Sequence, residues 1–397
     1  MKKILFIIIS ATIFGLLMSI LIHSGYYHKL IMGFKSVHFL LYLPLIILFL
    51  VLNILIHELG HMFSFIFQGV KIKALFFIIF GFIVNDKKVK FKVYPKNFKM
   101  LGGFVVPNFD PIENDEEYHL TRKKFTNALI AGPNTSIIYF IIVTVLFFLS
   151  WFLFKSSILL GLMSLLFITS FFMTLLIIFS SKLNTDEIYG DYVAFDKMKK
   201  DDRFALVQIL QYRQFSDINS MLENDFFLEL IKKDLEEKRL SNKMFDIVLS
   251  TYYLTMYLKT VKIEETNKII DYYNVSFLAS SKYGRELAYL ISAFYYKNGN
   301  SEEAVKLFNL VNSVKNHNLD SEALELLKKQ YEHLLNLADN HEYFISNSNS
   351  LLNQYSFLAP VINIGKVIEE LTYKLPFVPY LCKVLFNFEE QTENNID

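Results

Sequence analysis

The first half of the chain consists of long apolar runs separated by shorter polar segments. A helix that crosses a bilayer needs about 20 consecutive apolar residues, and four runs meet this requirement. After residue 181 the pattern changes abruptly to charged, amphipathic sequence, which is typical of soluble helices. The pattern therefore predicts a membrane part followed by a soluble helical part, and the predicted spans are residues 4–22, 39–67, 125–154 and 158–179.

The first of these runs follows Met1, Lys2 and Lys3, so a signal peptide is the alternative to a membrane helix. A signal peptide has a shorter apolar core and is followed by a cleavage site of small residues, and neither feature is found here. We therefore interpret residues 4–22 as the first transmembrane helix.

Between the second and third spans the apolar residues follow a different pattern. Residues 70–84 are apolar but too few to cross a bilayer, and residues 89–94 alternate apolar with basic side chains. Such alternation predicts a strand, and Asn85-Asp86 between the two runs predicts a hairpin turn. We therefore expect β-hairpins packed at the membrane edge, with a re-entrant helix over residues 70–84 as the alternative.

Beyond residue 200 the pattern is helical. Residues 287–308 predict two helices joined at residues 298–300, as in a tetratricopeptide hairpin, although no 34-residue period extends through the rest. The predicted fold is a mainly α membrane protein with about four transmembrane helices, a membrane-edge β-hairpin region and a cytoplasmic α-helical, tetratricopeptide-like domain. The predicted domains are residues 1–199, in the membrane, and residues 200–397.

Charge sets the orientation of the spans. Lysine and arginine cluster in the loop between the second and third spans, whereas the other two loops carry few. By the positive-inside rule this loop lies in the cytoplasm, and so do the N-terminus and everything after the fourth span. The basic residues of the loop are Lys71, Lys73, Lys87, Lys88, Lys90, Lys92, Lys96, Lys99, Arg122, Lys123 and Lys124.

Composition excludes some classes of site. The formal net charge of +1 by itself favours no class of partner, and we expect no nucleic acid among the partners. Cys382 is the single cysteine, so an intrachain disulfide and a four-cysteine zinc site are excluded.

The second span carries the sequence His-Glu-Leu-Gly-His at residues 57–61. Residues four apart lie on one face of a helix, so His57 and His61 can hold one zinc ion. Glu58 is then placed to take a proton from a zinc-bound water. A chance occurrence is the alternative, but it would leave costly polar groups in a membrane span without a task.

A third zinc ligand is expected near the cytoplasmic end of another span, because a catalytic zinc usually has three protein ligands and one open position. The acidic residues 184–192 follow the fourth span and contain the turn-forming Gly190. We favour Asp191, which follows Gly190 and precedes an apolar stretch, over Asp186 and Glu187. The choice between Asp191 and Asp186 stays open at this point, as does an ordinary solvated acidic linker.

Other polar and small residues near the motif have expected structural roles. Asn53 and Ser64 lie on the same helical face as the two histidines, which makes them candidate partners of the ligands. Residues 131–134 of the third span read Ala-Gly-Pro-Asn, and small residues let membrane helices approach closely. We therefore expect residues 131–134 to serve in helix packing, and Pro133 either to bend the helix or to mark its start.

Together these motifs resemble the site-2 protease family of intramembrane zinc metalloproteases. Residues 57–61 match that family's H-E-x-G-H form on a membrane helix, and residues 131–134 resemble its A-G-P…N element. Asn184 followed by Asp191 resembles its Asn-Pro…Asp-Gly element, although the proline is absent and Gly190-Asp191 has the inverted order. The resemblance covers residues 38–192.

The resemblance implies one zinc ion per chain, held by His57, His61 and Asp191. It implies Glu58 as the general base, and we expect Asn184 to donate a hydrogen bond to the developing oxyanion. The expected substrate is a peptide or single-span protein embedded in the bilayer, and the expected location is the cell membrane, with several spans and the active site toward the cytoplasm.

Two other classes of protein remain as alternatives. The first is a catalytically inactive membrane scaffold that acts through a protein partner on its helical C-terminal domain. The second is a transporter, which is disfavoured because polar residues along several spans would be needed and are absent.

Overall fold

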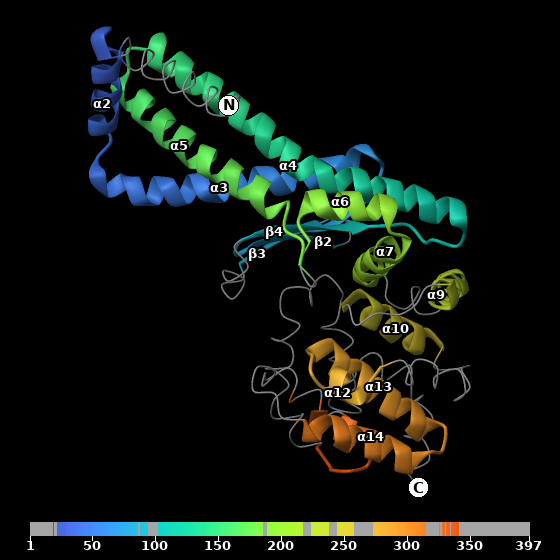
Figure 1. Ribbon diagram of the computed structural model, residues 1–397. Coiled ribbons are helices and arrows are strands. Elements are labelled where there is room, and N and C mark those ends of the chain that lie inside the picture. Colours follow the sequence, from blue (N-terminus) through green and yellow to red (C-terminus); the bar gives the residue numbers. More distant parts are fainter. Residues whose placement is uncertain are drawn as a thin grey trace, which may run out of the picture.

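The computed structural model describes residues 19, 22–85, 88–93, 102–185, 189–216, 224–237, 244–257, 273–314, 325, 328–329, 331–333 and 335–340 (Figure 1). Within these residues, three helices are long and apolar enough to cross a membrane. They coincide with the second, third and fourth predicted spans. The first predicted span, residues 4–22, lies almost entirely outside the described residues.

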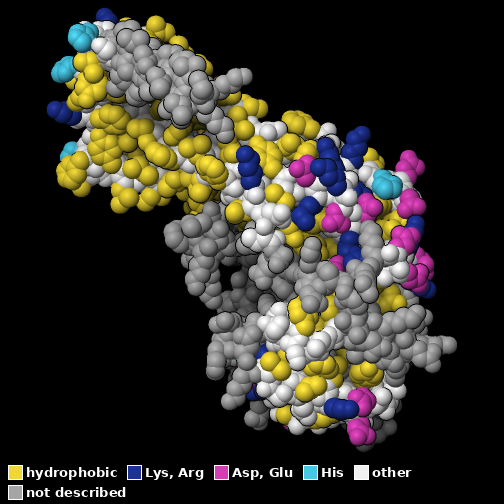
Figure 2. All heavy atoms as spheres, in the orientation of Figure 1, with side chains coloured by type: hydrophobic (Ala, Val, Ile, Leu, Met, Phe, Trp, Pro, Cys, Tyr) yellow, Lys and Arg dark blue, Asp and Glu magenta, His cyan; other side chains and the backbone are white. Residues whose placement is uncertain are grey.

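The three long helices are α3 (Tyr42–Phe67), α4 (Asp115–Phe152) and α5 (Ser157–Ser180). They are preceded by α2 (Tyr26–Ser36) and the short helix η1 (Phe39–Leu41). Figure 2 shows hydrophobic side chains covering the end of the molecule where α2, α3 and α5 lie, whereas charged side chains gather near the beginning of α4 and around α6. This distribution is the one that a bilayer around the three helices requires.

Helix α4 begins ten residues before the predicted start of its span, at Asp115 rather than residue 125. The side chain of Asn114 accepts a hydrogen bond from the Glu117 backbone amide at 3.0 Å, and Glu117 in turn accepts one from the Glu113 amide at 2.7 Å. These two hydrogen bonds stabilise the start of the helix, with Asn114 as the capping residue. Pro133 lies inside α4, so it does not mark the start of the helix. At 1.5 Å per residue, the 38-residue helix extends about 57 Å, well beyond a bilayer core.

Glycines set the closest approaches between the membrane helices. A Cβ atom added to Gly60 of α3 would lie 2.6 Å from Thr135 Oγ1 and 2.8 Å from the Ala131 carbonyl oxygen of α4. A Cβ atom on Gly161 of α5 would lie 2.2 Å from the Gly33 carbonyl oxygen of α2. These positions therefore allow pairs of helices to touch backbone to backbone.

The loop after α3 forms a four-stranded antiparallel sheet of order β3-β2-β1-β4. The expected β-hairpins are confirmed, and the alternative of a re-entrant helix is wrong. The predicted turn lies between β2 and β3, where Asn85 pairs with Lys88. A second turn, at residues 78–79, divides the apolar run, with Phe77 paired to Phe80. The strands are β1 (Lys71–Phe77), β2 (Phe80–Asn85), β3 (Lys88–Val93) and β4 (Gly103–Asn108).

The sheet lies between the membrane helices and the helical part. On one face Leu75 and Val105 join the core that contains Phe65 of α3. On the opposite face Ala74, Phe76, Ile83 and Val106 form a cluster packed against Tyr212 of α7 (Asp202–Ser216). Alternate residues of one strand therefore pack into two different clusters, one on each face of the sheet, as the period-two pattern requires.

The helical part begins with α6 (Asp191–Lys200), which packs along α4, and continues in α7. Asp201 separates these two helices, and its side chain accepts a hydrogen bond from the Phe204 amide at 3.1 Å, which caps α7. Arg122 of α4 forms an ion pair of 2.6 Å with Asp202. The later helices are α9 (Asp225–Glu237), α10 (Met244–Tyr257), α12 (Val275–Leu278), α13 (Lys282–Lys297) and α14 (Ser301–Ser313).

Ion pairs of a buried arginine connect α7 to α9 and α10, and a helical hairpin follows these helices. Arg203 of α7 is buried and donates to Asp234 of α9 at 2.5 Å and to Asp246 of α10 at 2.8 Å. Helices α13 and α14 form the hairpin expected over residues 287–308, with Gly299 in the left-handed conformation at φ 80°. The wider tetratricopeptide-like character and the domain boundary at residue 199 stay predictions.

Candidate metal centre

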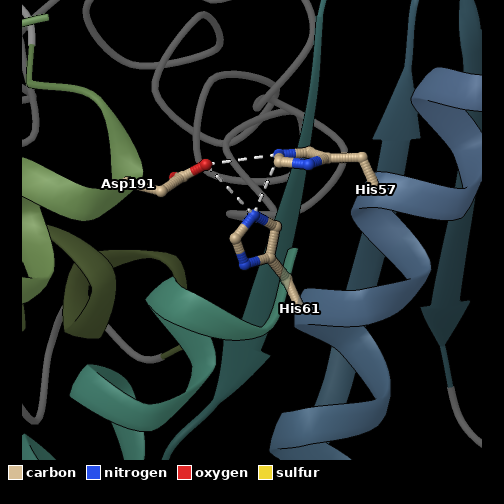
Figure 3. A group of neighbouring side chains, drawn as sticks. All are labelled: His57, His61 and Asp191. Atoms are coloured by element: carbon tan, nitrogen blue, oxygen red, sulfur yellow. Dashed lines mark hydrogen bonds and ion pairs between the residues drawn. The ribbon is translucent and has the colours of Figure 1, made fainter. Parts of the chain in front are cut away.

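Three potential metal ligands converge at the junction of α3, α4 and α6. His57 Nε2 lies 3.3 Å from Asp191 Oδ2, and His61 Nε2 lies 3.7 Å from the same oxygen. The two histidine Nε2 atoms are 3.2 Å apart. Figure 3 shows the three side chains pointing toward one another, the histidines from successive turns of α3 and the carboxylate from the start of α6.

These separations fit a tetrahedral zinc ion. Zinc bonds to histidine nitrogen and carboxylate oxygen are about 2.0–2.2 Å long, so neighbouring ligand atoms of a tetrahedral site lie about 3.3 Å apart. Two nitrogens and one oxygen are also the donor set of many catalytic zinc sites, and they leave the fourth position open. The side chains are therefore suited to a resident zinc ion.

Helix α4 holds both histidine rings in the orientation that a metal needs. His61 Nδ1 donates to the Ala128 carbonyl oxygen at 2.7 Å. His57 Nδ1 lies 3.2 Å from Ser136 Oγ, which itself donates to the Gly132 carbonyl oxygen at 3.2 Å. With the proton on Nδ1, each Nε2 presents its lone pair to the centre.

The expected partners Asn53 and Ser64 have other roles. Asn53 is buried and donates to the Phe49 carbonyl oxygen at 2.7 Å and to Ser170 Oγ at 3.1 Å, which links α3 to α5. Ser64 accepts from Gln68 Nε2 at 3.3 Å near the end of α3. The partners of the histidines come from α4 instead, so residues 128–136 serve the site as well as helix packing.

Gly132 provides the space that the His61 ring occupies. A Cβ atom at this position would lie 2.2 Å from His61 Nε2 and 2.5 Å from its Cε1 atom. Asn134, the last residue of the same Ala-Gly-Pro-Asn element, is exposed and does not line the cavity of the site. The glycine, rather than the asparagine, is therefore the member of this element that the metal centre needs.

Asp191 is the first residue of α6 and is held against the end of α5. Ser181 Oγ donates to Asp191 Oδ2 at 3.4 Å, and the Tyr192 amide donates to the Ser181 carbonyl oxygen at 3.0 Å. Burial alone would raise the pKa of Asp191, but hydrogen bonds and electrostatic interactions with His57 and His61 outweigh burial and lower that pKa below its usual range. The carboxylate is thus held ionised, as a metal ligand must be.

Gly190 is required for space rather than for flexibility. Its φ of −72° is open to any residue, so the expected flexible turn is not its contribution. A Cβ atom there would lie only 2.1 Å from the Ser180 carbonyl oxygen. The glycine therefore lets α6 start directly against α5. The rival ligands Asp186 and Glu187 lie outside the described residues.

Glu58 is buried beside the histidines and lines the same cavity. Strand β4 covers it, because a Cβ atom on Gly103 would lie 2.3 Å from Glu58 Cγ. Asn184 is exposed, pairs with Tyr189 in an isolated bridge and is not part of the cavity lining. Its predicted role at the oxyanion stays a prediction that this geometry does not support.

A cavity of about 520 Å³ opens onto the three ligands. Helix α3 lines it with His57 and Glu58, and β4 with Gly103 and Phe104. Helix α7 contributes Tyr212, which sequence reasoning missed because the residue is far along the chain and belongs to no motif. The apolar lining residues include Ile54, Phe65, Phe125, Leu129, Met173, Leu176 and Ile177.

Comparison with known proteins agrees with this geometry. Residues 45–367 match the sequence profile of peptidase family M50, which covers most of the chain. No curated protein and no solved structure matches the chain. The profile includes α3 with its paired histidines, α4 that supports them, and Asp191 that completes the group. The chain therefore belongs to peptidase family M50, the site-2 protease family of intramembrane metalloproteases.

Proposed function

We propose that this chain is a multi-pass membrane zinc endopeptidase that hydrolyses a membrane-embedded peptide or single-span protein. The observation that carries the proposal is the convergence of His57, His61 and Asp191 beside the buried Glu58, at one end of three apolar helices. His57, His61 and Asp191 would hold one zinc ion per chain.

The bound zinc ion would supply Lewis acidity, which lowers the pKa of a coordinated water and polarises a peptide carbonyl. The Glu58 carboxylate, buried next to both histidines, accepts a proton from the attacking water. The same carboxyl group then delivers this proton to the nitrogen of the leaving amine. Ser136 and the Ala128 carbonyl oxygen keep the histidine rings fixed while the proton moves.

The cavity suits an extended apolar peptide. Aliphatic and aromatic side chains of α3, α4 and α5 contribute to its lining, and Gly103 brings the backbone of β4 next to Glu58. A substrate strand could pair with the sheet and present its carbonyl groups to the site. A helical substrate would have to unwind first, because the carbonyl groups of a helix are already hydrogen bonded within it.

The proposed topology places the site toward the cytoplasm. The sheet that follows α3 carries exposed lysines at positions 88, 90 and 92, and α6 ends with Lys197, Lys199 and Lys200. Positive charge at these positions favours the cytoplasmic side of the membrane. His57 lies ten residues before the end of α3, or about 15 Å at 1.5 Å per residue, so water reaches the site through the cavity.

The test compares the peptides in membranes of cells that produce the wild type or Glu58→Gln, measured by mass spectrometry. Glu302→Gln is the matched control, because Glu302 is an exposed glutamate on α14. We expect products in the wild type and the control that are absent in Glu58→Gln, while zinc content stays equal. Identical peptides in all three would refute the protease and favour the inactive scaffold.

A further inference from the structure

Among the described residues, α7 reaches into the metal cavity at Tyr212. Tyr212 lines the same cavity as His57, Glu58 and Asp191, although it lies in the sequence after all the predicted spans. Its side chain is half-buried and lines this cavity. A substrate bound against the ligands would therefore meet this side chain.

The ring of Tyr212 is fixed from two sides. It contacts Phe125 of α4 edge to face, with ring centroids 4.7 Å apart and planes at 76°. It also contacts Phe104 of β4, at 6.1 Å and 62°. Contacts of this kind stabilise an aromatic ring in one orientation. The hydroxyl group is thus carried on a rigid support, and a phenylalanine could keep the same ring contacts.

The surroundings keep the phenol protonated. Burial raises the pKa of Tyr212, and the negative charges of Glu58 and Asp191 raise it further. A protonated phenol can donate a hydrogen bond, and a carbonyl oxygen that gains negative charge accepts one most strongly.

Other hydroxyl groups of the described lining have structural tasks. Ser180 Oγ donates to the Ile177 carbonyl oxygen at 3.0 Å, and Ser181 Oγ contacts the Asp191 carboxylate at 3.4 Å. Asn184, the donor expected from the sequence, is exposed outside the lining. Tyr212 carries the remaining hydroxyl group of the described lining.

We propose that Tyr212 is a catalytic residue whose hydroxyl group donates a hydrogen bond to the substrate carbonyl oxygen as negative charge develops there. This inference rests on the proposed protease function. It makes α7 a component of the active site, in addition to α6, which supplies Asp191. No bond to Tyr212 forms or breaks, so the proton stays on its oxygen throughout.

The test uses the full-length, zinc-loaded protein and a peptide substrate. The cleavage products of this substrate are identified beforehand by comparing the membranes of cells that produce the wild type or Glu58→Gln. Tyr212→Phe removes the hydroxyl group and keeps the ring, and Tyr118→Phe is the control, since Tyr118 is a buried tyrosine of α4 outside the cavity lining. We expect kcat to fall about 100-fold in Tyr212→Phe, with KM changed less than about threefold, as for the loss of one oxyanion donor.

A second readout does not depend on turnover. A zinc-binding peptide hydroxamate should bind Tyr212→Phe about tenfold more weakly than the wild type or Tyr118→Phe, with equal zinc content in all three. Wild-type kcat and hydroxamate affinity in Tyr212→Phe would overturn the role of Tyr212 and leave the protease intact. Failure of the wild type itself to cleave, with Glu58→Gln indistinguishable from it, would overturn the protease and the role of Tyr212 together.

Discussion

Two glycine contacts at opposite ends of the membrane helices differ in what they make room for. Gly132 of α4 and Gly161 of α5 each lie so near a neighbour that an added Cβ would approach an atom to 2.2 Å. At Gly132 that atom is Nε2 of His61, the end of a side chain. At Gly161 it is the carbonyl oxygen of Gly33 in α2, which belongs to a helix backbone.

Equal distances therefore have unequal consequences. A histidine ring can swing aside and leave the fold intact, but its hydrogen bond to the Ala128 carbonyl oxygen and its place at the metal would be lost. A helix backbone cannot swing aside, so a side chain at Gly161 must push α2 and α5 apart. One glycine serves a site and the other serves the packing of the bundle.

Gly132→Ala should have the largest effect, and the effect should fall on zinc affinity. Displacing the His61 ring removes a ligand, so we expect zinc to bind at least about 100-fold more weakly. The free energy of unfolding of the metal-free protein should change little, because alanine favours a helix by about 1 kcal/mol relative to glycine. Competition with a zinc chelator measures the first quantity, and thermal unfolding in detergent the second. Normal zinc affinity would show that the ring contact has no role.

Gly161→Ala should behave in the opposite way. Overpacking against the α2 backbone should destabilise the fold by about 1–3 kcal/mol, with zinc affinity in the folded protein unchanged. Both variants add the same methyl group to a helix, so each is the other's control. Thermal unfolding and zinc titration of both variants test this expectation. A loss of zinc affinity in Gly161→Ala would contradict the assignment of Gly161 to helix packing alone.

Ser136→Ala should have the smallest effect, since it removes one contact without displacing a ring. Without the hydroxyl group at 3.2 Å, His57 Nδ1 loses its partner on α4. We expect zinc to bind about tenfold more weakly and the fold to keep its stability. Ser313 is an exposed serine, so Ser313→Ala is the control in the same chelator titration. Equal affinities would mean that α4 orients only His61.

The membrane helices could be predicted because their apolar runs are long, but the start of α4 could not. The start of α4 at Asp115 depends on the cap formed by Asn114 and Glu117, a signal that is present in the sequence and lies outside the apolar run. The hairpin turn at residues 78–79 could not be predicted from its residue types, because both residues are isoleucines. Ile78 has a φ of 53°, which β-branched residues rarely adopt.

The three residues that converge at the candidate metal centre could be predicted, whereas the groups around them could not. His57 and His61 share one helix, so local spacing was sufficient, and Asp191, which the structure brings to them, was favoured because it follows Gly190 and precedes an apolar stretch. Ser136 and Tyr212 come from other helices, and no local pattern connects them to the motif. Their positions follow from tertiary packing, which a single sequence does not encode in its periodicity.

The most direct test of the account is the zinc content of the purified full-length protein and three carboxylate variants. Asp191→Ala removes the proposed ligand, Asp186→Ala removes its rival from the sequence, and Asp196→Ala is a control on the exposed face of α6. Zinc content is measured by mass spectrometry after equilibration at a fixed free zinc concentration. The account predicts about one zinc per chain in the wild type, Asp186→Ala and Asp196→Ala, and a large loss in Asp191→Ala. Zinc retained in Asp191→Ala and lost in Asp186→Ala would contradict it.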